Sequence, residues 1–311
     1  MSEPSRHERI AGGLVGLLVG DALGVPYEFH PPEDIPSPVE MEPPHGYRRA
    51  HAAVPPGTYS DDGAHALALL ASLLDRGRLD PDDLGARLVR WFEHGELAVD
   101  GRVFDVGIQT TTAIDALKRG VSALDAGPAD ERANGNGSLM RVLPLALWHR
   151  GTDAELVRDA ELQSRVTHGH ARSQVCCSLY CLWARRILDE SPSPWTDALA
   201  ALRATIAPGT DRQDALEHHM RPDDEVLRGT GTGYVIDTLR SARDCSAQPD
   251  YERAVQAAIA LGHDTDTTAC VTGGIVGARA GVAGIPPRWV DSLRGREIWQ
   301  PLLDRLLALH A

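Results

Sequence analysis

Two apolar stretches with glycines at helical spacing constrain the fold of this chain more than any other feature. They cover residues 7–25 and 269–283. The first contains Gly12, Gly13, Gly16 and Gly20, and the second contains Gly273, Gly274, Gly277 and Gly281. Residues three or four apart lie on one face of a helix, and a face without side chains lets a neighbouring backbone come close. Each stretch is therefore predicted to be a closely packed, buried helix.

The composition also favours a helical core. Of the 311 residues, 42% are hydrophobic but only 5% are aromatic, so the core must consist mainly of Ala, Leu, Val and Ile. Such a composition favours close-packed helices over a β-sandwich. We find no internal repeat and no convincing run of alternating strands. The sequence therefore predicts an all-α protein, a compact helical bundle that forms one domain over residues 1–311.

The charge and the cysteines limit the possible partners and compartment. The net charge is −13 and the pI is about 5.4, which argues against general binding to nucleic acids or membranes. The five cysteines lack the spacing of a zinc site and are expected to be buried thiols in a reducing cytoplasm. Residues 10–25 are as apolar as a signal peptide, but Asp21 interrupts them and a small-residue cleavage site is missing, so we expect a buried helix.

The segment Gly262–Thr268 is the strongest candidate for chemistry. Asp264 and Asp266, two positions apart, can point at one centre from an irregular backbone, and Thr267 adds a hydroxyl oxygen. Hard cations such as Mg²⁺ prefer such all-oxygen ligands. The alternative interpretation is an N-terminal cap of the following helix with surplus polar residues.

Two further acidic positions flank predicted helices. Ser60, Asp61 and Asp62 precede an apolar helix expected at about 64–74, where they can cap the helix and still reach a metal ion. Glu28 follows the predicted end of the first helix, between two aromatic residues. Burial there can raise the pKa of its carboxyl group, although an ordinary solvated glutamate is the alternative.

Other candidates lie on predicted loops. Asp105 directly precedes a helix expected at about 109–119, a position that also suits a cap. The turn at residues 134–138 alternates Asn and Gly, so its backbone N–H groups either cradle a phosphate or simply form a turn. His168 lies at a predicted helix junction and could face a substrate. Residues 30–57 are rich in proline and are expected to form a long ordered loop or a lid.

Taken together, these segments resemble the ADP-ribosylglycohydrolase family. Four segments carry the resemblance, in order along the chain: residues 20–28, 59–62, 134–144 and 261–267. Any one of them is a weak signal, whereas all four in the family order are specific. The resemblance implies an all-α orthogonal helical bundle with a binuclear Mg²⁺ or Mn²⁺ site.

The resemblance also implies roles for individual residues. The implied metal ligands are Ser60, Asp61, Asp62, Asp264, Asp266 and Thr267. Glu28 would be the catalytic acid beside the metals, and Asp105 an acid near the substrate ribose. The implied substrate-binding residues are Asn134, Gly135, Asn136, Gly137, Ser138 and His168, with the 135–138 loop on the diphosphate. Gly63 departs from the threonine that is usual in the family, and we expect it to loosen the start of its helix.

The implied activity is hydrolysis of the glycosidic bond between ADP-ribose and a modified acceptor, with a protein arginine side chain as the expected acceptor. The expected partner is thus an ADP-ribosylated protein or a small ADP-ribosyl substrate. Two alternatives stay open: a hydrolase of another linkage (serine, nucleobase or small ADP-ribose ester) and a non-catalytic ADP-ribose-binding protein. Retention of Glu28 and six oxygen ligands argues against the binding protein, because crowded acids cost stability without a metal.

Overall fold

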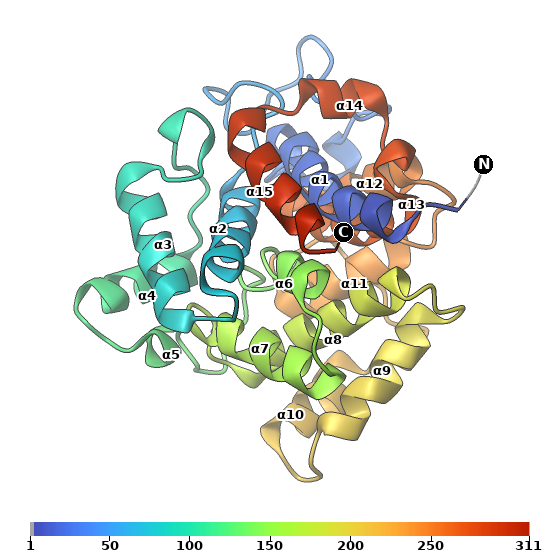
Figure 1. The fold of residues 1–311 in the computed structure, drawn as a ribbon. Coiled ribbons are helices and arrows are strands. Elements are labelled where there is room, and N and C mark those ends of the chain that lie inside the picture. The colour runs from blue at the N-terminus through green and yellow to red at the C-terminus, as the bar shows by residue number, and fades with distance from the viewer. Residues whose placement is uncertain (1–2, 311) are drawn as a thin grey trace.

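The fold is built around two antiparallel helices, α1 (Arg6–Gly24) and α13 (Thr265–Ala280), which lie side by side (Figure 1). The computed structural model describes residues 3–310. A Cβ atom added at Gly12 would lie 2.2 Å from the carbonyl oxygen of Gly277, and real Cβ contacts essentially never fall below 3.0 Å. The other glycines that α1 turns toward α13 meet its backbone in the same way. The prediction of two closely packed, buried helices is confirmed.

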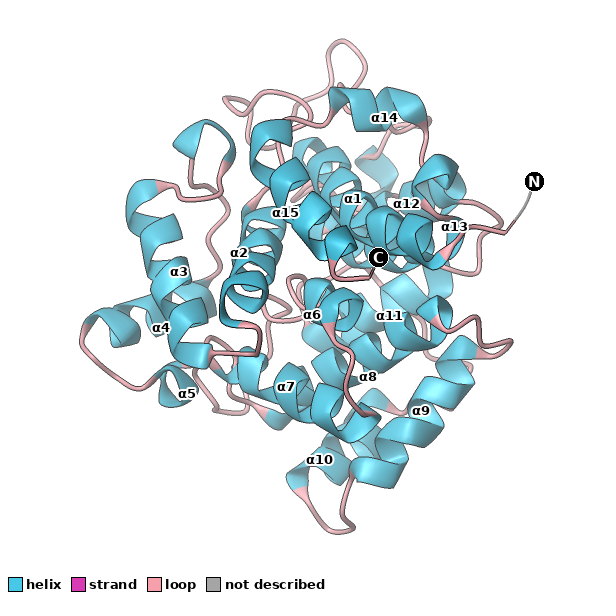
Figure 2. Ribbon diagram, viewed as in Figure 1, coloured by secondary structure: helices cyan, strands magenta, loops and turns pink. Residues whose placement is uncertain are grey.

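The remaining helices surround this pair, and no β-strand occurs within residues 3–310 (Figure 2). They are α2 (Asp61–Arg76), α3 (Pro81–His94), α4 (Ile108–Lys118), α5 (Ala123–Ala126), α6 (Leu143–Trp148), α7 (Asp153–Arg165), α8 (Ala171–Leu188), α9 (Pro194–Thr205), α10 (Asp211–Asp214), α11 (Val235–Cys245), α12 (Tyr251–Ile259), α14 (Pro287–Ser292) and α15 (Arg296–Ala308). A π-helical turn, Ala215–Met220, continues α10. The all-α prediction is confirmed, although the short helices α5 and α6 were not predicted.

The first turn of α2 is held by a buried carboxylate on α1. Ser60 accepts the backbone N–H of Asp62, as its predicted capping role requires. Asp21 accepts the N–H groups of Ser60 at 2.9 Å and Gly63 at 2.7 Å, so the helix begins earlier than predicted. A Cβ at Gly63 would lie 2.8 Å from the ring of Tyr59. The expectation that Gly63 loosens this helix is wrong, because Asp21 fixes its N–H and the missing side chain makes room for Tyr59.

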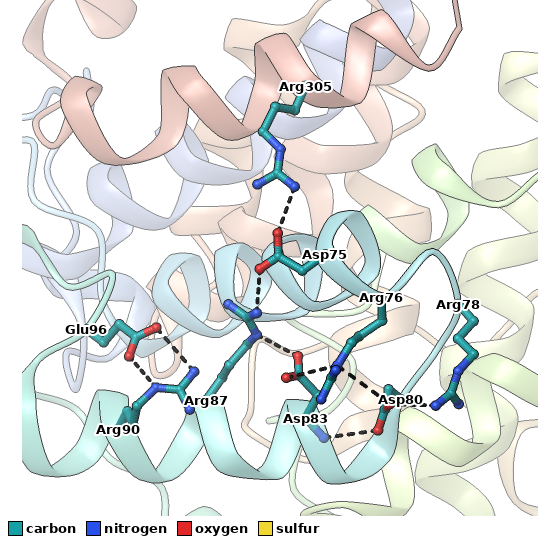
Figure 3. A network of polar contacts seen from close by, with 9 residues as sticks. All are labelled: Asp75, Arg76, Arg78, Asp80, Asp83, Arg87, Arg90, Glu96 and Arg305. Atoms are coloured by element: carbon teal, nitrogen blue, oxygen red, sulfur yellow. Dashed lines mark hydrogen bonds and ion pairs between the residues drawn. The ribbon is translucent and has the colours of Figure 1, made fainter.

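A surface network of ion pairs links α2, α3 and α15 (Figure 3). Asp75 on α2 accepts N–H groups from Arg87 of α3 at 2.6 Å and from Arg305 of α15 at 2.7 Å. The network comprises Asp75, Arg76, Arg78, Asp80, Asp83, Arg87, Arg90, Glu96 and Arg305. The Asp75–Arg305 pair is exposed, and an exposed ion pair contributes about 1 kcal/mol at most. The Asp83–Arg87 pair is largely buried, so the network ties the three helices together at both exposed and buried positions.

Helix α1 has the length and composition of a membrane span but lies inside the fold. Residues Arg6–Tyr27 are long and apolar enough to cross a membrane, but their most apolar stretch is entirely buried in the protein. The buried helix expected from the interruption at Asp21 is therefore confirmed. All five cysteines are also buried and free, as predicted.

Candidate active site

The acidic ends of α1, α2 and α13 converge on one pocket of about 550 Å³. The candidate residues that line it are Glu28, Asp61, Asp62, Asp105, Gly135, Asn136, Gly137, His168, Asp264 and Thr267. Four others do not line it: Ser60, Asn134, Ser138 and Asp266. All four are buried. The Ser138 hydroxyl, for example, lies 2.8 Å from that of Ser164 instead of facing the pocket.

Glu28 is a buried carboxylate held by a histidine of the proline-rich loop. Its Oε2 lies 2.6 Å from Nε2 of His51, which is itself 3.9 Å from Asp105. Burial raises the pKa of Glu28 to about 10, and the charges of Asp105 and Asp264 add to this effect. Phe29, one of the two aromatic neighbours noted in the sequence, is 69% exposed. The predicted direction of the pKa shift is correct, but Phe29 contributes little to the burial.

A pair of backbone hydrogen bonds fixes the Glu28 segment against the start of α13. Phe29 donates its N–H to the carbonyl of His263, and His263 donates to that of His30, both at 2.7 Å. Phe29 and His263 have positive φ values of 64° and 61°, a conformation that is costly for residues with side chains. The hydroxyl of Thr265 also donates to the carbonyl of Gly24 at 2.8 Å. These two strained segments thus hold Glu28 beside Asp264 and Asp266 at the start of α13.

The acids of α2 and α13 contact one another beneath the pocket. The hydroxyl of Thr267 donates to Oδ1 of Asp62 at 3.3 Å, and its N–H donates to Oδ1 of Asp266 at 2.9 Å. Asp264 occupies the N-cap position of α13, yet its side chain makes no capping bond and instead accepts from Asn136 at 2.7 Å. Capping therefore does not explain the Asp264 carboxylate, which is held toward the pocket.

The acid cluster has the properties of a site for a hard cation. Single carboxylate oxygens of Glu28, Asp264 and Asp266 lie within 4.8 Å of one another. The Oδ2 atoms of Asp62 and Asp266 are buried without a hydrogen-bond partner among the described residues. Burial and mutual repulsion raise the pKa values of Asp61, Asp62 and Asp266 well above the ordinary range. Buried charges require compensation, and an all-oxygen donor set suits Mg²⁺ or Mn²⁺.

The glycine-rich turn offers fewer free donors than the sequence suggested. The N–H of Gly135 donates to the side chain of Gln109 at 2.6 Å, and that of Asn136 donates to the carbonyl of Gly233 at 3.2 Å. The N–H groups of residues 137–138 have no acceptor within the described part of the chain. Only this half of the predicted cradle is available to an anion.

His168 supplies a further donor next to this turn. Arg141, fully buried, donates to the hydroxyl of Thr167 at 2.7 Å and to the carbonyl of Gly137 at 3.3 Å. The hydroxyl of Thr167 lies 2.8 Å from Nδ1 of His168, and in the tautomer in which this hydroxyl donates to Nδ1 the imidazole proton lies on Nε2. Burial and then Arg141 lower the pKa of His168 to about 3, so the ring is neutral.

Some features of the site escaped the sequence reasoning. No sequence motif flanks His51 or Gln109. His51 lies in the ordered loop or lid expected over residues 30–57, and this was the one indication that it could reach the site. Asp105, which also suited a cap, is not one, because Gly107 is the N-cap of α4 and Asp105 has a positive φ of 57°.

The loop at 229–234 is held by a carboxylate of α11. Asp237 accepts the N–H groups of Thr230 at 2.9 Å and of Thr232 at 2.7 Å. Thr232 and Gly233 contribute to the pocket wall. The loop therefore forms a fixed part of the site.

The helical fold and its acid-lined pocket agree with the class of protein to which the chain is similar. The family model described as ADP-ribosylglycohydrolase matches residues 2–311. The chain belongs to the ADP-ribosylglycohydrolase family, and it is an enzyme of the glycohydrolase class. The family and the enzyme class expected from the four sequence segments are confirmed.

Individual relatives cover most of the chain. It is 31% identical to the ADP-ribosylarginine hydrolase Tri1 of Pseudomonas putida (strain GB-1), over 96% of this chain and 78% of that protein. It is 29% identical to the ADP-ribosyl-(dinitrogen reductase) glycohydrolase of Rhodospirillum rubrum, over 99% of both. A solved structure, an ADP-ribosylglycohydrolase-related protein complex, superposes with a TM-score of 0.78 and 30% identity over 99% of each chain. The helical bundle of this family is therefore confirmed as the fold.

Proposed function

We propose that this enzyme hydrolyses the glycosidic bond between ADP-ribose and a modified acceptor, with divalent cations at the acid cluster. The observation that carries the proposal is the pair of buried carboxylate oxygens on Asp62 and Asp266 that have no hydrogen-bond partner among the described residues, with Asp266 next to Glu28. A binding protein would gain nothing from crowding these acids. We further propose that the enzyme works in the reducing cytoplasm, where its free thiols would persist.

The proposed cation ligands come from the starts of two helices. They are Ser60, Asp61 and Asp62 before and in α2, and Asp264, Asp266 and Thr267 at α13. When bound, two Mg²⁺ or Mn²⁺ ions would supply positive charge that orients the ribose and favours attack by water. The protein prepares for this by fixing both ligand groups, through Asp21 on one side and Asn136 on the other.

Glu28 is the proposed proton-handling group. Cleavage at the anomeric carbon passes through an oxocarbenium-like state and leaves an acceptor atom that needs a proton. The raised pKa of Glu28 lets this carboxyl group hold a proton at neutral pH, and His51 at 2.6 Å can orient it. Cations nearby would lower that pKa toward the working pH.

The donors of the glycine-rich turn face the diphosphate in this proposal. The N–H of Gly137 and, in the tautomer that carries its proton on Nε2, the imidazole of His168 are neutral donors around one part of the pocket. Neutral, fixed dipoles bind an anion in a pocket whose other wall is acidic. They thus separate the diphosphate from the carboxylates.

An arginine side chain is the proposed acceptor. Asp105 lines the same pocket as Glu28, and a carboxylate at this place suits a guanidinium leaving group. The similarity to an ADP-ribosylarginine hydrolase supports this choice. A serine, nucleobase or ester linkage is the second candidate. The loops that would contact the acceptor, among them the proline-rich segment, decide which linkage the enzyme accepts.

Release of free ADP-ribose from arginine-, serine- and nucleobase-linked substrates tests the proposal. Each would be incubated with Mg²⁺, with Mn²⁺ and with a chelator. We expect cation-dependent release from the arginine linkage. Release from a different linkage alone would overturn the acceptor, and release unaffected by the chelator would overturn the cation requirement. Binding of ADP-ribose without release from any substrate would favour a binding protein.

A further inference from the structure

A second pocket lies at the opposite end of the α1–α13 pair. It has a volume of about 540 Å³ and lies between α1, α8, α9, α11 and α13. Arg9 and Arg279 contribute from the ends of α1 and α13 that are remote from Gly24 and Asp266. At a rise of 1.5 Å per residue, Arg9 and Gly24 are about 22 Å apart along α1. The two pockets share no lining residue.

Three guanidinium groups line this second pocket, and backbone carbonyls hold each of them. Arg9 donates to the carbonyl of Arg279 at 2.9 Å, and Arg243 donates to that of Pro222 at 2.7 Å. Arg279 donates to the carbonyl of Ser246 at 2.6 Å. Carbonyl groups orient a guanidinium but leave its charge uncompensated. Within residues 3–310, Arg243 and Arg279 form no ion pair, so their charges are available to an anion.

The acidic residues at this pocket are poor partners for Arg9. Glu3 and Glu190 approach it only to 3.5 and 3.7 Å, and neither forms a hydrogen bond with it. Their side chains are 85% and 57% exposed, whereas Arg9 is buried with its Nε lacking any hydrogen-bond partner in the described chain. The lining therefore has more arginines than acids, although the chain as a whole carries a net charge of −13.

An apolar wall of rings completes the pocket. Trp183 and Trp195 meet edge to face at 5.1 Å, and the guanidinium of Arg243 lies 4.6 Å from the centre of the Trp195 ring. Pro192 and Pro194 continue this wall. Flat aromatic and proline surfaces bury planar rings well. The Nε1 atom of Trp195 is also buried, and no acceptor for it lies in the part of the chain that the structure describes.

We propose that the second pocket binds a nucleoside phosphate, a small anion that carries a phosphate beside a flat ring. Guanidinium groups match phosphate oxygens in geometry and charge, and the indole and proline surfaces match the ring. The volume lies within the usual range for small-ligand sites, about 300–1,000 Å³. The ligand lies too far from Glu28 to react, so this is a binding site separate from the catalytic pocket.

Titration with AMP tests the proposal, with adenosine and inorganic phosphate as the two halves of the ligand. Tryptophan fluorescence reports on this site, since Trp183 and Trp195 line it and no tryptophan lines the catalytic pocket. Calorimetry gives an independent affinity. We expect saturable AMP binding that is at least about 10-fold tighter than binding of either half. Adenosine binding as tightly as AMP would overturn the role of the arginines.

Substitutions distinguish the second pocket from the catalytic one. Arg243→Gln and Arg279→Gln should each weaken AMP binding by about 10-fold, with melting curves to verify folding. Arg253→Gln, at an arginine outside both pockets, and Asp264→Asn, in the catalytic pocket, should leave it unchanged. Equal AMP binding by all four variants, or a loss confined to Asp264→Asn, would overturn the proposal.

Discussion

The two ends of the α1–α13 pair carry opposite charges that the protein handles in different ways. At one end, Asp62 and Asp266 have buried oxygens that find no hydrogen-bond partner in residues 3–310. At the other end, backbone carbonyls hold the guanidinium groups of Arg9, which is buried, and of Arg279, which is exposed. The helices are close enough for backbone contact along their whole length, so both ends rest on the same rigid support.

The difference shows which end depends on a bound ion. Several carboxylates within a few ångströms repel one another, and the protein offers no cation among the described residues to pair with the deepest two. The guanidinium groups already have carbonyl acceptors and need no counter-ion to stay in place. The stability of the acidic end should therefore depend on divalent cations, whereas the stability of the basic end should not.

The largest expected effect is loss of activity at the acidic end. Asp266→Asn keeps an oxygen for the Thr267 N–H but removes a charge from the proposed cation site. We expect ADP-ribose release to fall by at least about 100-fold. Substituting a residue that only supports a metal ligand already lowers metal affinity or activity by about 10–100-fold. Asp82→Asn, at an exposed acid on α3, is the matched control and should be fully active.

The same variant separates a catalytic loss from unfolding. In chelator, Asp266→Asn should melt no lower than the wild type, because it relieves repulsion between buried acids. A lower melting temperature in chelator together with normal activity in Mg²⁺ would contradict the acid-cluster model.

A methyl group at Gly24 should damage both stability and activity. Its Cβ would lie 2.4 Å from the Cα of Asp266, so α1 and α13 must separate where the acids meet. We expect Gly24→Ala to lower the free energy of unfolding by about 3 kcal/mol. Gly12→Ala, whose Cβ would lie 2.2 Å from the Gly277 carbonyl at the basic end, should cost similar stability. Its folded fraction should nevertheless keep normal turnover per active molecule.

Gly13 provides the control for this pair of glycine variants. A Cβ there would be 3.1 Å from a Leu147 methyl group, a flexible neighbour that can move. Alanine is the better helix former by about 1 kcal/mol, and this gain should offset the cost of moving the Leu147 methyl group. The melting temperature of Gly13→Ala should therefore be nearly unchanged. A large drop in the melting temperature of Gly13→Ala would show that α1 is sensitive to an added methyl group even where that group does not meet the backbone of α13.

Stability without cations should fall as the pH rises from 7 to 9. The pKa of Glu28 is about 10 in the fold against an ordinary 4.5, and those of Asp62 and Asp266 are also raised. The folded state then holds protons that the unfolded state has lost, so raising the pH favours unfolding. The lowered pKa values of His65 and His168 act in the opposite sense, but only below about pH 6.5.

Calorimetric melting in chelator across this interval checks the sign. A decrease of a few degrees is expected, at about 2 °C per kcal/mol for a chain of this size. Mg²⁺ should remove the decrease by occupying the carboxylates. A melting temperature that rises from pH 7 to 9 in chelator would show that the acids are ionised and otherwise compensated.

The smallest expected effect concerns His51, which positions Glu28 from the proline-rich loop. His51→Gln should lower kcat by about 10-fold and shift the pH–rate profile, because the Glu28 carboxyl group would lose its partner at 2.6 Å. His45→Gln, at an exposed histidine on the same loop, is the matched control. An unchanged pH–rate profile for His51→Gln would remove His51 from the mechanism.

The sequence predicted the parts of the site that depend on local pattern. Ser60 caps its helix, and Asp264, Asp266 and Thr267 follow the turn that starts α13, because capping and helix-entry rules act over a few residues. The roles of these residues as ligands remain predictions. Glycine spacing likewise predicted the central helices, since close packing requires a bare face.

Interactions between distant segments could not be predicted in the same way. His51 reaches Glu28 across a loop without periodicity, and Gln109 takes a donor of the glycine-rich turn from 26 positions away. The occupation of two N–H groups in that turn depends on where other loops lie. No residue pattern near either position encodes such a contact.

The burial of α1 has a consequence for the chain as it is made. Its partner helix begins 241 positions later, at the hydrogen bond between Thr265 and Gly24. At 5–20 residues per second, a ribosome needs roughly 12–50 s to bridge that gap. Throughout that time, a helix with the hydropathy of a membrane span lacks the partner that packs against its glycine face. The bare glycine face that makes the folded enzyme compact is thus the face of α1 that waits longest for its partner, until Thr265–Ala280 has emerged.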